Sequence, residues 1–502
     1  MSLFDYVVVG GGSAGCVVAS RLSEDPGVSV CLLEAGPSDV GDEKILRLSD
    51  WMFLLESGYD WDYLVEPQER GNSFLRHSRA RVLGGCSSHN SCIAFWPLRE
   101  DLAAWGLPGW GFDECLPLLR RLEDTVRIRT VPPQDPCGVA LLEAAAQAGL
   151  PTVSFDAGAT VVNGAGWFRI NASDDGIRSS SSHAYLHPVL ESRPNLTVIT
   201  DAWASRVLLS DRRATGVEYL AADRVHRLTV SARREVIVSC GAIDTPKLLM
   251  LSGIGPAEHL REVGVDVVVD APGVGANLDD HVEGLVMWDA AKPMVSESTQ
   301  WWEIGLFAAT REGLDRPDLM MHYGSVPFDL NTVRWGYPTT ENGFCLTPNV
   351  TQGRSRGTVR LRSRDFRDKA RVDPRYFTDD EGHDERVMLA GLRLARTIAA
   401  QPALAGWVGR ELAPGPSAVT DDELLDYVHK THNTVYHPSC TARMGRDDDP
   451  YAVLDAQLRV RGVRGLRVAD ASAMPLLTTV NPNLTTMMIG ERCGDLIRAS
   501  TG

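Results

Sequence analysis

The sequence predicts an α/β fold that opens with a Rossmann-like β-α-β unit and continues into a second, α+β unit. The β-branched and aromatic run FDYVVV at residues 4–9 indicates a strand, which stops abruptly at three glycines. Residues 13–22 place small and apolar side chains at helical spacing, and the apolar run at residues 28–33 indicates the next strand. A β-α-β unit of about 30 residues belongs in a parallel sheet.

Later segments supply the remaining strands and helices. Apolar runs between Gly- and Pro-containing loops predict strands at residues 196–200, 217–220, 228–230, 236–239 and 265–269. From about residue 290 to 433 the chain is rich in aromatic residues, and we expect an α+β unit with a strand at 358–361 and helices at 385–400 and 421–429. The four serines at 179–182 predict a polar loop.

The composition limits the class of protein. The 502 residues include 50 Lys and Arg against 66 Asp and Glu, a formal charge of −16 at pH 7 without a long basic run, which argues against nucleic-acid binding. No apolar run approaches the ~18 residues of a membrane span, and the N-terminus lacks signal-peptide features, so we expect a cytoplasmic protein. Ten scattered cysteines without metal-ligand spacing predict neither disulfides nor a metal site.

The glycine-rich turn at the start indicates a dinucleotide site. Gly10, Gly12 and Gly15 form a G-x-G-x-x-G pattern between the predicted strand and helix, and Glu34 lies 19 positions beyond the third glycine. The glycines permit a tight turn and a close approach of backbone to a pyrophosphate, while the start of the helix offers N–H donors, including that of Ser13. Glu34 is then placed to accept hydrogen bonds from an adenosine ribose.

The same turn also fits a different class of enzyme. Residues 11–15 read G-x-S-x-G, which in an α/β-hydrolase would make Ser13 the nucleophile of an acyl-transfer reaction. This interpretation is weaker, because a nucleophile elbow normally follows several strands and Ser13 follows the first one.

Four further motifs identify a family. They are RVLGGCSSHN at residues 81–90, GAIDTP at 241–246 with SGIGP at 252–256, GLRVAD at 465–470, and NPN at 481–483. With the glycine-rich turn, they resemble the glucose-methanol-choline (GMC) flavoprotein oxidoreductases from end to end. The resemblance implies an FAD-binding domain built from residues 1–131, 187–284 and 435–502. It also implies a substrate-binding domain, with a mostly antiparallel sheet, built from residues 132–186 and 285–434.

The resemblance also implies the catalytic residues of an alcohol oxidation. His437 and Asn481 match the two catalytic positions, at which the histidine acts either as a general base or as a hydrogen-bond donor to the alkoxide. His322 and Ser91 match two further polar positions of the pocket. A hydride would pass to flavin N5, and the electrons would go on to O2 to give hydrogen peroxide.

The cofactor positions follow from the same resemblance. His89 matches a residue that links covalently to the flavin in some members; the alternative is contact without a bond. The remaining cofactor-binding positions that we expect are Gly10, Gly12, Ser13, Gly15, Glu34, Gly84, Asn90, Val207, Asp470, Asn481 and Pro482.

The substrate class depends on an aromatic cluster. Trp51, Trp302, Phe328 and Tyr436 match the positions that surround a trimethylammonium group in the members that oxidise choline, and Glu283 matches the neighbouring carboxylate. The resemblance thus implies choline as the substrate, betaine aldehyde and glycine betaine as products, and a homodimer. An oxidase or dehydrogenase for another primary alcohol is the alternative.

Three departures from the family pattern stand out. The chain after Asp124 lacks a loop that other members carry near the site entrance, which leaves lid behaviour open. Cys440, after Ser439, replaces a usual glycine, and Leu476-Leu477 replaces a polar pair.

Overall fold

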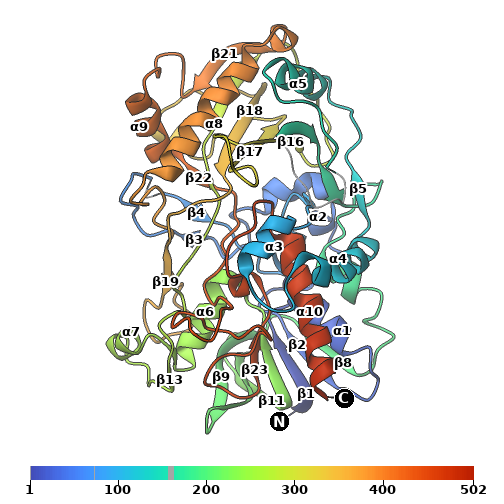
Figure 1. Ribbon diagram of the computed structural model, residues 1–502. Coiled ribbons are helices and arrows are strands. Elements are labelled where there is room, and N and C mark those ends of the chain that lie inside the picture. The colour runs from blue at the N-terminus through green and yellow to red at the C-terminus, as the bar shows by residue number, and fades with distance from the viewer. Residues whose placement is uncertain (1, 73, 156–162, 502) are drawn as a thin grey trace.

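Two β-sheets organise the chain, one in the lower and one in the upper half of the view in Figure 1. The computed structural model describes residues 2–72, 74–155 and 163–501. The N- and C-terminal ends both lie at the bottom of the lower half, beside the first strand and the last helix.

The lower sheet, called the mixed sheet here, has the order β8-β2-β1-β11-β10-β9, and β23 also pairs with β11. Strand β1 (Ser2–Val9) pairs in parallel with β2 (Val30–Leu33) and β11 (Arg227–Val238), so the predicted β-α-β unit with helix α1 (Gly15–Leu22) is confirmed. Its inner strands are buried on both faces, which explains their continuous apolar sequences. The other strands are β8 (Leu196–Ile199), β9 (Trp203–Ser210), β10 (Arg213–Leu220) and β23 (Leu466–Val468).

The upper sheet, called the antiparallel sheet here, has the order β21-β15-β18-β17-β16-β6, with β14 pairing β18 and β22. All its pairings are antiparallel, as expected. Helix α8 (His383–Ala399) packs against β17 and β18. The strands are β6 (Gly164–Trp167), β14 (Val282–Glu283), β15 (Val286–Ala290), β16 (Trp302–Ala308), β17 (Leu319–Gly324), β18 (Gly343–Val350), β21 (Val408–Ala413) and β22 (Asn433–Thr434).

The remaining elements connect and cover the sheets. The helices are α2 (Glu43–Leu46), α3 (Arg99–Trp105), α4 (Phe112–Val126), α5 (Pro136–Gln147), α6 (Gly241–Leu251), α7 (Ala257–Glu262), α9 (Asp421–Thr431) and α10 (Asn483–Thr501), with short helical turns η1 (Leu48–Leu54), η2 (Gly85–Ser88), η3 (Ser182–Leu186), η4 (Val333–Trp335), η5 (Pro402–Leu404) and η6 (Ala471–Ala473). The short strands are β3 (Tyr63–Leu64), β4 (Arg76–His77), β5 (Ile128–Thr130), β7 (Arg169–Asn171), β12 (Ile254–Gly255), β13 (Val269–Asp270), β19 (Thr358–Arg360) and β20 (Arg371–Asp373). Strands of both sheets come from distant parts of the chain, and the expected domain boundaries stay a prediction.

Two strand predictions were wrong in extent. The runs at 228–230 and 236–239 belong to one strand, β11, which continues through an irregularity at Arg233 and Arg234, where both side chains bind the carboxylate of Asp5. The run at 265–269 yields only β13, because Val265 closes the end of α7 and Val268 and Val269 donate to the carbonyl of Gly253.

The four-serine segment is not an exposed loop. Ser180, Ser181 and Ser182 are fully buried, and the hydroxyls of Ser181 and Ser182 contact Ser87, Ser88 and the carboxylate of Asp39. The hydroxyls find these partners in segments distant in sequence, so composition alone could not show their burial.

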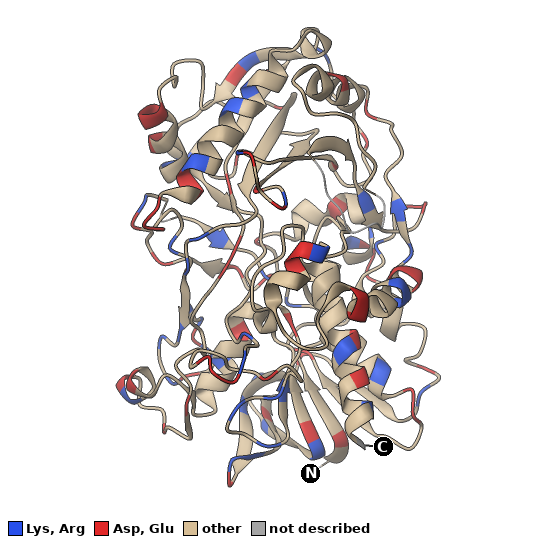
Figure 2. Ribbon diagram, viewed as in Figure 1, with Lys and Arg blue, Asp and Glu red and all other residues tan. Residues whose placement is uncertain are grey.

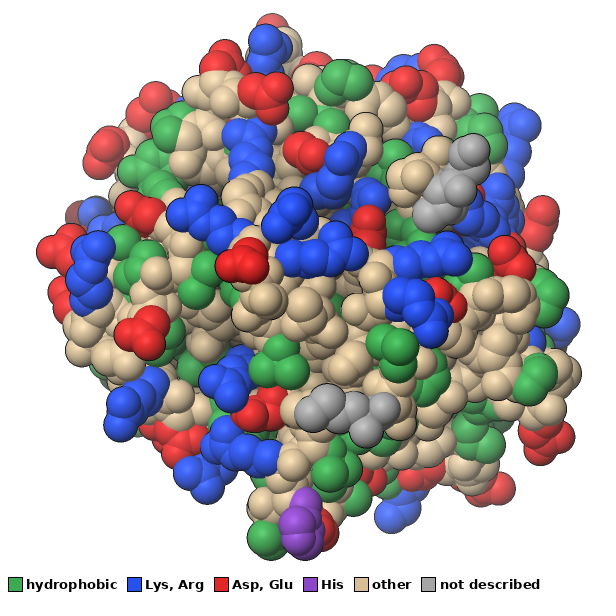
Figure 3. Space-filling model, turned by 90° about the horizontal axis from the view of Figure 1, so that it is seen from below, with side chains coloured by type: hydrophobic (Ala, Val, Ile, Leu, Met, Phe, Trp, Pro, Cys, Tyr) green, Lys and Arg blue, Asp and Glu red, His purple; other side chains and the backbone are tan. Residues whose placement is uncertain are grey.

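Residues of both charge signs are interspersed along the ribbon in both halves of the molecule (Figure 2). Viewed from below, Lys and Arg gather near the centre of the face, with Asp and Glu among and around them (Figure 3). No helix in the described ranges is long and apolar enough to cross a membrane. All ten cysteines are free, and the described residues contain no group of three or more His, Cys, Asp or Glu arranged to hold a metal ion.

Candidate active site

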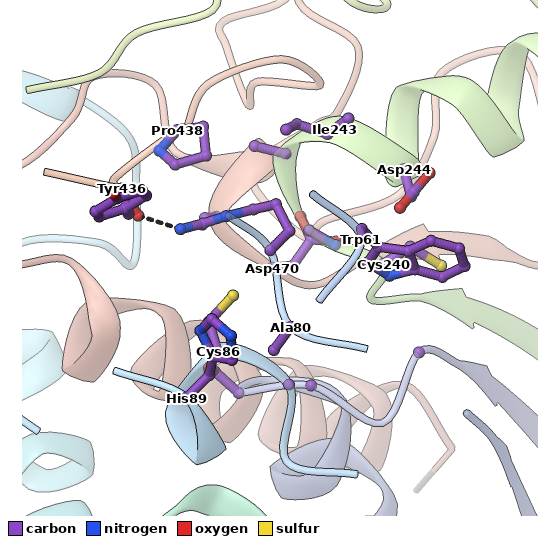
Figure 4. Close-up of a pocket in the computed structure, with 18 of the residues that line it drawn as sticks. Trp61, Ala80, Cys86, His89, Cys240, Ile243, Asp244, Tyr436, Pro438 and Asp470 are labelled. Carbon is purple, nitrogen blue, oxygen red and sulfur yellow. Dashed lines mark hydrogen bonds between the residues drawn. The ribbon is translucent and has the colours of Figure 1, made fainter. Parts of the chain in front are cut away.

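One large cavity brings most of the predicted site residues together. It encloses about 1950 Å³ of space, including the part open to solvent. Its lining comes from the end of β1, the glycine-rich turn, residues 78–91, the start of β9, helix α6 and the segments 435–438 and 470–486. In Figure 4, Tyr436 and Pro438 lie across from His89 and Cys86, and Trp61, Cys240 and Asp244 lie at the far end.

The glycine-rich turn has the geometry that a dinucleotide needs. Gly10 has φ +97°, and a Cβ there would lie 2.4 Å from the carbonyl oxygen of Ser239. A Cβ at Gly15 would lie 1.9 Å from the carbonyl oxygen of Gly10, so this glycine lets helix α1 pack on the turn. At Gly12 the nearest atom is 3.9 Å away and the residue faces the cavity, which leaves space for a phosphate against the backbone.

Glu34 lies at the end of β2 and lines the same cavity. Its two carboxylate oxygens accept hydrogen bonds from the N–H groups of Gly11 (2.8 Å) and Gly36 (2.7 Å). Burial raises its pKa to about 7. Each oxygen keeps a second lone pair for a ligand hydroxyl, so the position fits recognition of a ribose.

Not every predicted cofactor residue reaches the cavity. Ser13, Asn90, Asp470, Asn481 and Pro482 line it. Three others do not line it: Gly15, which packs within the glycine-rich turn, Val207 and Gly84. Val207 lies inside β9 with its N–H donating to Ser252, and the start of the segment, residues 202–204, faces the cavity instead. Gly84 shapes the turn before η2, since it has φ +89° and its Cβ space is filled by the Ser88 hydroxyl.

His437 and Asn481, the two residues predicted to be catalytic, lie next to each other. The Nε2 atom of His437 lies 3.4 Å from Nδ2 of Asn481, and its Nδ1 atom lies 2.9 Å from Nδ1 of His281. Burial is the main reason why the pKa of His437 lies well below its usual range, and the neighbouring His281 lowers it further. The neutral imidazole can accept a proton at Nε2 in one tautomer and donate one there in the other.

His322 and Ser91 line the same cavity. His322 is buried on β17, with Nδ1 3.7 Å from Oε1 of Glu283 and 3.4 Å from Nδ2 of Asn349. The imidazole therefore lies beside the carboxylate of Glu283 and lines the same cavity as His437 and Asn481.

The four aromatic residues and Glu283 come together in three dimensions. The rings of Trp51 and Trp302 lie 5.4 Å apart at 77°, and those of Trp302 and Phe328 lie 5.2 Å apart at 81°. Tyr436 and the buried Glu283 line the same cavity. Ring faces beside a carboxylate form a site for a cation that cannot donate hydrogen bonds.

His89 is buried directly after η2, and its Nε2 lies 3.0 Å from the carbonyl oxygen of Leu54. Burial lowers its pKa to about 4. If Nε2 carries the proton and donates to Leu54, Nδ1 is left with a free lone pair, as a bond to a cofactor would require.

Several cavity residues were missed. Arg79, Trp61, Trp203 and Lys247 line the cavity, and His281 contacts His437. The rings of Trp61 and Trp203 lie 5.2 Å apart. A run of ionisable residues at 279–281 within an apolar segment was a signal for His281; the two tryptophans are far apart in sequence and gave none.

The departures from the family pattern have local structural effects. Cys440 is fully buried with φ +72°, a conformation that glycine adopts more easily. After Asp124, helix α4 ends at Val126 and β5 pairs at once with β7, so no lid-like segment occurs there. Leu476 is partly exposed, and its carbonyl accepts a hydrogen bond from Trp105.

Comparisons with known proteins agree with the motifs. Two family models described as GMC oxidoreductase match residues 4–283 and 353–490. The choline oxidase of Arthrobacter globiformis is 63% identical over 99% of this chain and 94% of the relative, and the mitochondrial choline dehydrogenase of Mus musculus is 38% identical over 99% and 89%. The structure of pyridoxine 4-oxidase from Mesorbium loti superposes with a TM-score of 0.91 at 31% identity, covering 99% of both chains.

These findings leave the hydrolase interpretation without support. Ser13 lies in the glycine-rich turn and lines the cavity. In the described part of the chain, no hydrogen bond joins its hydroxyl to a histidine, as an activated nucleophile would need.

Proposed function

The chain belongs to the GMC oxidoreductase family, and from this premise we propose that it is an FAD-dependent oxidase whose substrate is choline. One observation carries the choice of substrate. The cluster of Trp51, Trp302, Phe328 and Tyr436 with Glu283 lines the same cavity as the His437–Asn481 pair. A quaternary ammonium alcohol has one group for each part of this cavity. Its cation would bind the aromatic rings and the carboxylate of Glu283, and its hydroxyl would bind the imidazole of His437 and the amide of Asn481.

The residues around the cavity fit FAD. The open side of Gly12 and the start of α1 would hold the pyrophosphate, and Glu34 would hold the ribose. When bound, FAD supplies the hydride acceptor. His89 would attach it covalently.

The protein's own groups then prepare the alcohol. The aromatic cluster and Glu283 fix the trimethylammonium end, which limits the freedom of the hydroxyl end. His437 accepts the hydroxyl proton at Nε2 or donates a hydrogen bond to the oxygen, and Asn481, His322 and Ser91 stabilise the developing negative charge.

The overall reaction balances in two rounds. Choline and O2 give betaine aldehyde and hydrogen peroxide; the hydrated aldehyde and a second O2 give glycine betaine and a second hydrogen peroxide. We also propose a cytoplasmic location, which suits ten free cysteines. A homodimer stays our prediction, and light scattering after gel filtration measures it.

An oxygen-electrode assay of the purified yellow protein tests this function. Choline, betaine aldehyde, benzyl alcohol and hexanol are compared, with an artificial electron acceptor in parallel. We expect oxygen uptake with choline and betaine aldehyde at far higher kcat/KM than with the neutral alcohols. Turnover of choline only with the artificial acceptor would identify a dehydrogenase, and a preference for hexanol or benzyl alcohol would reject choline.

A further inference from the structure

One peptide group joins the aromatic cluster to the catalytic histidine, and ionic side chains hold it at both ends. The carbonyl oxygen of Tyr436 accepts a hydrogen bond from Nη2 of Arg79 at 2.5 Å, marked by the dashed line in Figure 4. The N–H of His437 donates to Oδ1 of Asp280 at 2.9 Å. The carbonyl and the N–H belong to the same peptide plane, so a cation and an anion bind the two ends of its dipole.

The peptide needs such support, because its first residue is strained. Tyr436 has φ +63°, in the left-handed region that side chains with a Cβ rarely adopt. The hydroxyl of Thr434 accepts a hydrogen bond from the N–H of Tyr436 at 2.7 Å, which holds the preceding peptide. A change of φ at Tyr436 would move its ring relative to the preceding peptide, and it would also move the carbonyl that leads on to His437.

Asp280 is built to stay an anion. Although burial alone raises its pKa, the pKa lies below its usual value because His77, Thr434 and Tyr376 surround the carboxylate. The hydroxyls of Thr434 and Tyr376 donate to Oδ2 at 2.6 Å and 2.5 Å. Thr434 belongs to the segment that leads to His437, but His77 and Tyr376 come from other parts of the chain. Their contacts hold the carboxylate of Asp280 in place independently of His437.

Arg79 is a cation without a counter-ion. Its side chain lines the cavity, and its Nε donates to the carbonyl of Ser78. The carboxylate of Asp60 accepts from the backbone N–H of Arg79 at 2.8 Å, but among the described residues no carboxylate forms an ion pair with the guanidinium. Its charge is therefore available to the carbonyl of Tyr436, since charge-assisted hydrogen bonds are stronger than neutral ones.

We propose that Arg79 and Asp280 are positioning residues. By binding the two ends of the Tyr436–His437 peptide they hold Tyr436 in its left-handed conformation, so that the tyrosine ring and the imidazole face the same cavity. The measurements of kcat for choline rest on the proposed function, whereas the crystal structures of the variants test the proposal without it.

A glycine at position 436 gives a sharp test, because glycine adopts a positive φ without strain. We expect Arg79→Met to lower kcat for choline by about 10- to 100-fold, the loss of one charged hydrogen bond. In a Tyr436→Gly background the same change should lower kcat less than about threefold. The control is Tyr436→Ala, which also lacks the ring but keeps the Cβ, and there the full loss should persist.

Two variants separate positioning from charge. If Arg79 instead acts through its charge on the substrate or cofactor, Arg79→Met costs the same in all three backgrounds, and the proposal is overturned. Arg79→Lys keeps a cation and a hydrogen-bond donor, so its kcat should lie between those of Arg79→Met and the unmodified protein. If Arg79→Met does not fold, Arg79→Lys takes its place in the three backgrounds. Asp280→Asn should show the same dependence on the residue at position 436.

Crystal structures decide the matter even if choline is not the substrate. In Arg79→Met, or in Asp280→Asn, φ of Tyr436 should leave the left-handed region and the imidazole of His437 should turn. A peptide unchanged in both variants would show that neither residue positions it. Absence of choline oxidation by the unmodified protein would reject the proposed function alone.

Discussion

At the scale of single residues, Glu283 tests how the cavity recognises its substrate. In the proposed function the buried carboxylate, which lines the same cavity as the rings of Trp51, Trp302 and Phe328, would attract the substrate cation in the ground and transition states alike. We expect Glu283→Gln to raise KM for choline about tenfold or more, with little change in kcat. Steady-state kinetics measure it. The neutral analogue 3,3-dimethylbutan-1-ol is the control, and an equal rise in its KM would show that Glu283 acts by structure and not by charge.

His322 tests the catalytic side of the cavity. It is buried, with Nδ1 3.7 Å from Oε1 of Glu283, and it lines the same cavity as His437 and Asn481. Loss of an oxyanion donor costs about 2.7–4 kcal/mol, so His322→Ala should lower kcat about 100- to 1000-fold. Stopped-flow measurement of flavin reduction isolates this step. An unchanged rate would remove His322 from the catalytic residues.

His89 tests the attachment of the cofactor. The imidazole is buried, neutral and hydrogen-bonded through Nε2, which leaves Nδ1 for a covalent bond. We expect yellow colour to stay with the protein pellet after acid precipitation and to pass to the supernatant in His89→Ala. Colour released from the unmodified protein would show that the flavin is held by contacts alone.

Sequence reasoning identified the residues that sit in local motifs or match family positions. His437, Asn481, Glu34 and Glu283 were predicted in this way, and all four line the cavity; their roles stay predictions. Arg79 was missed because its contact with Tyr436 joins segments 357 positions apart, and it acts on a backbone carbonyl, which no side-chain pattern encodes.

At the scale of elements, the end of helix α9 carries a buried histidine with a clear pH signature. His432 is fully buried, and its Nδ1 lies 3.0 Å from the carbonyl oxygen of Val428. Burial lowers its pKa to about 4, against about 6.5 in the unfolded chain. The folded state therefore binds fewer protons between these values, and His432 takes away about 3 kcal/mol of stability as the pH falls through this range.

The variant His432→Asn keeps a donor for Val428 but does not titrate. We expect its thermal midpoint to fall less steeply than that of the unmodified protein between pH 7 and 4.5. The control is His226→Asn: Asp223 raises the pKa of this exposed histidine, so His226 adds stability at low pH and its removal should not make the profile flatter. Parallel profiles for His432→Asn and the unmodified protein would contradict the assignment.

Long helices and strands could be predicted from the sequence, and very short strands could not. The strand at residues 4–9 and the helices near 385–400 and 421–429 were all found, because each repeats its apolar period several times. Strands of two or three residues, such as β14 and β22, depend on tertiary pairing and leave almost no periodic signal.

At the scale of the whole molecule, the cavity links the two sheets. Its lining includes Glu34 next to the mixed sheet and Trp302 and His322 from the antiparallel sheet. A ligand that binds only the folded state at 1000 times its dissociation constant adds about 4 kcal/mol. We expect flavin removal from the His89→Ala variant to lower the thermal midpoint and to speed proteolysis, and added FAD to reverse both. Identical midpoints with and without FAD would contradict a cofactor site between the sheets.

The spread of the lining along the chain also has a consequence for biosynthesis. The cavity needs the turn at Gly10 and Gly12 as well as Asn481, Pro482 and Thr486. During translation, nearly all of the polypeptide must leave the ribosome before the last wall of the cavity exists. Flavin loading is therefore a late event of maturation, and nascent chains stalled before Asn481 should emerge colourless.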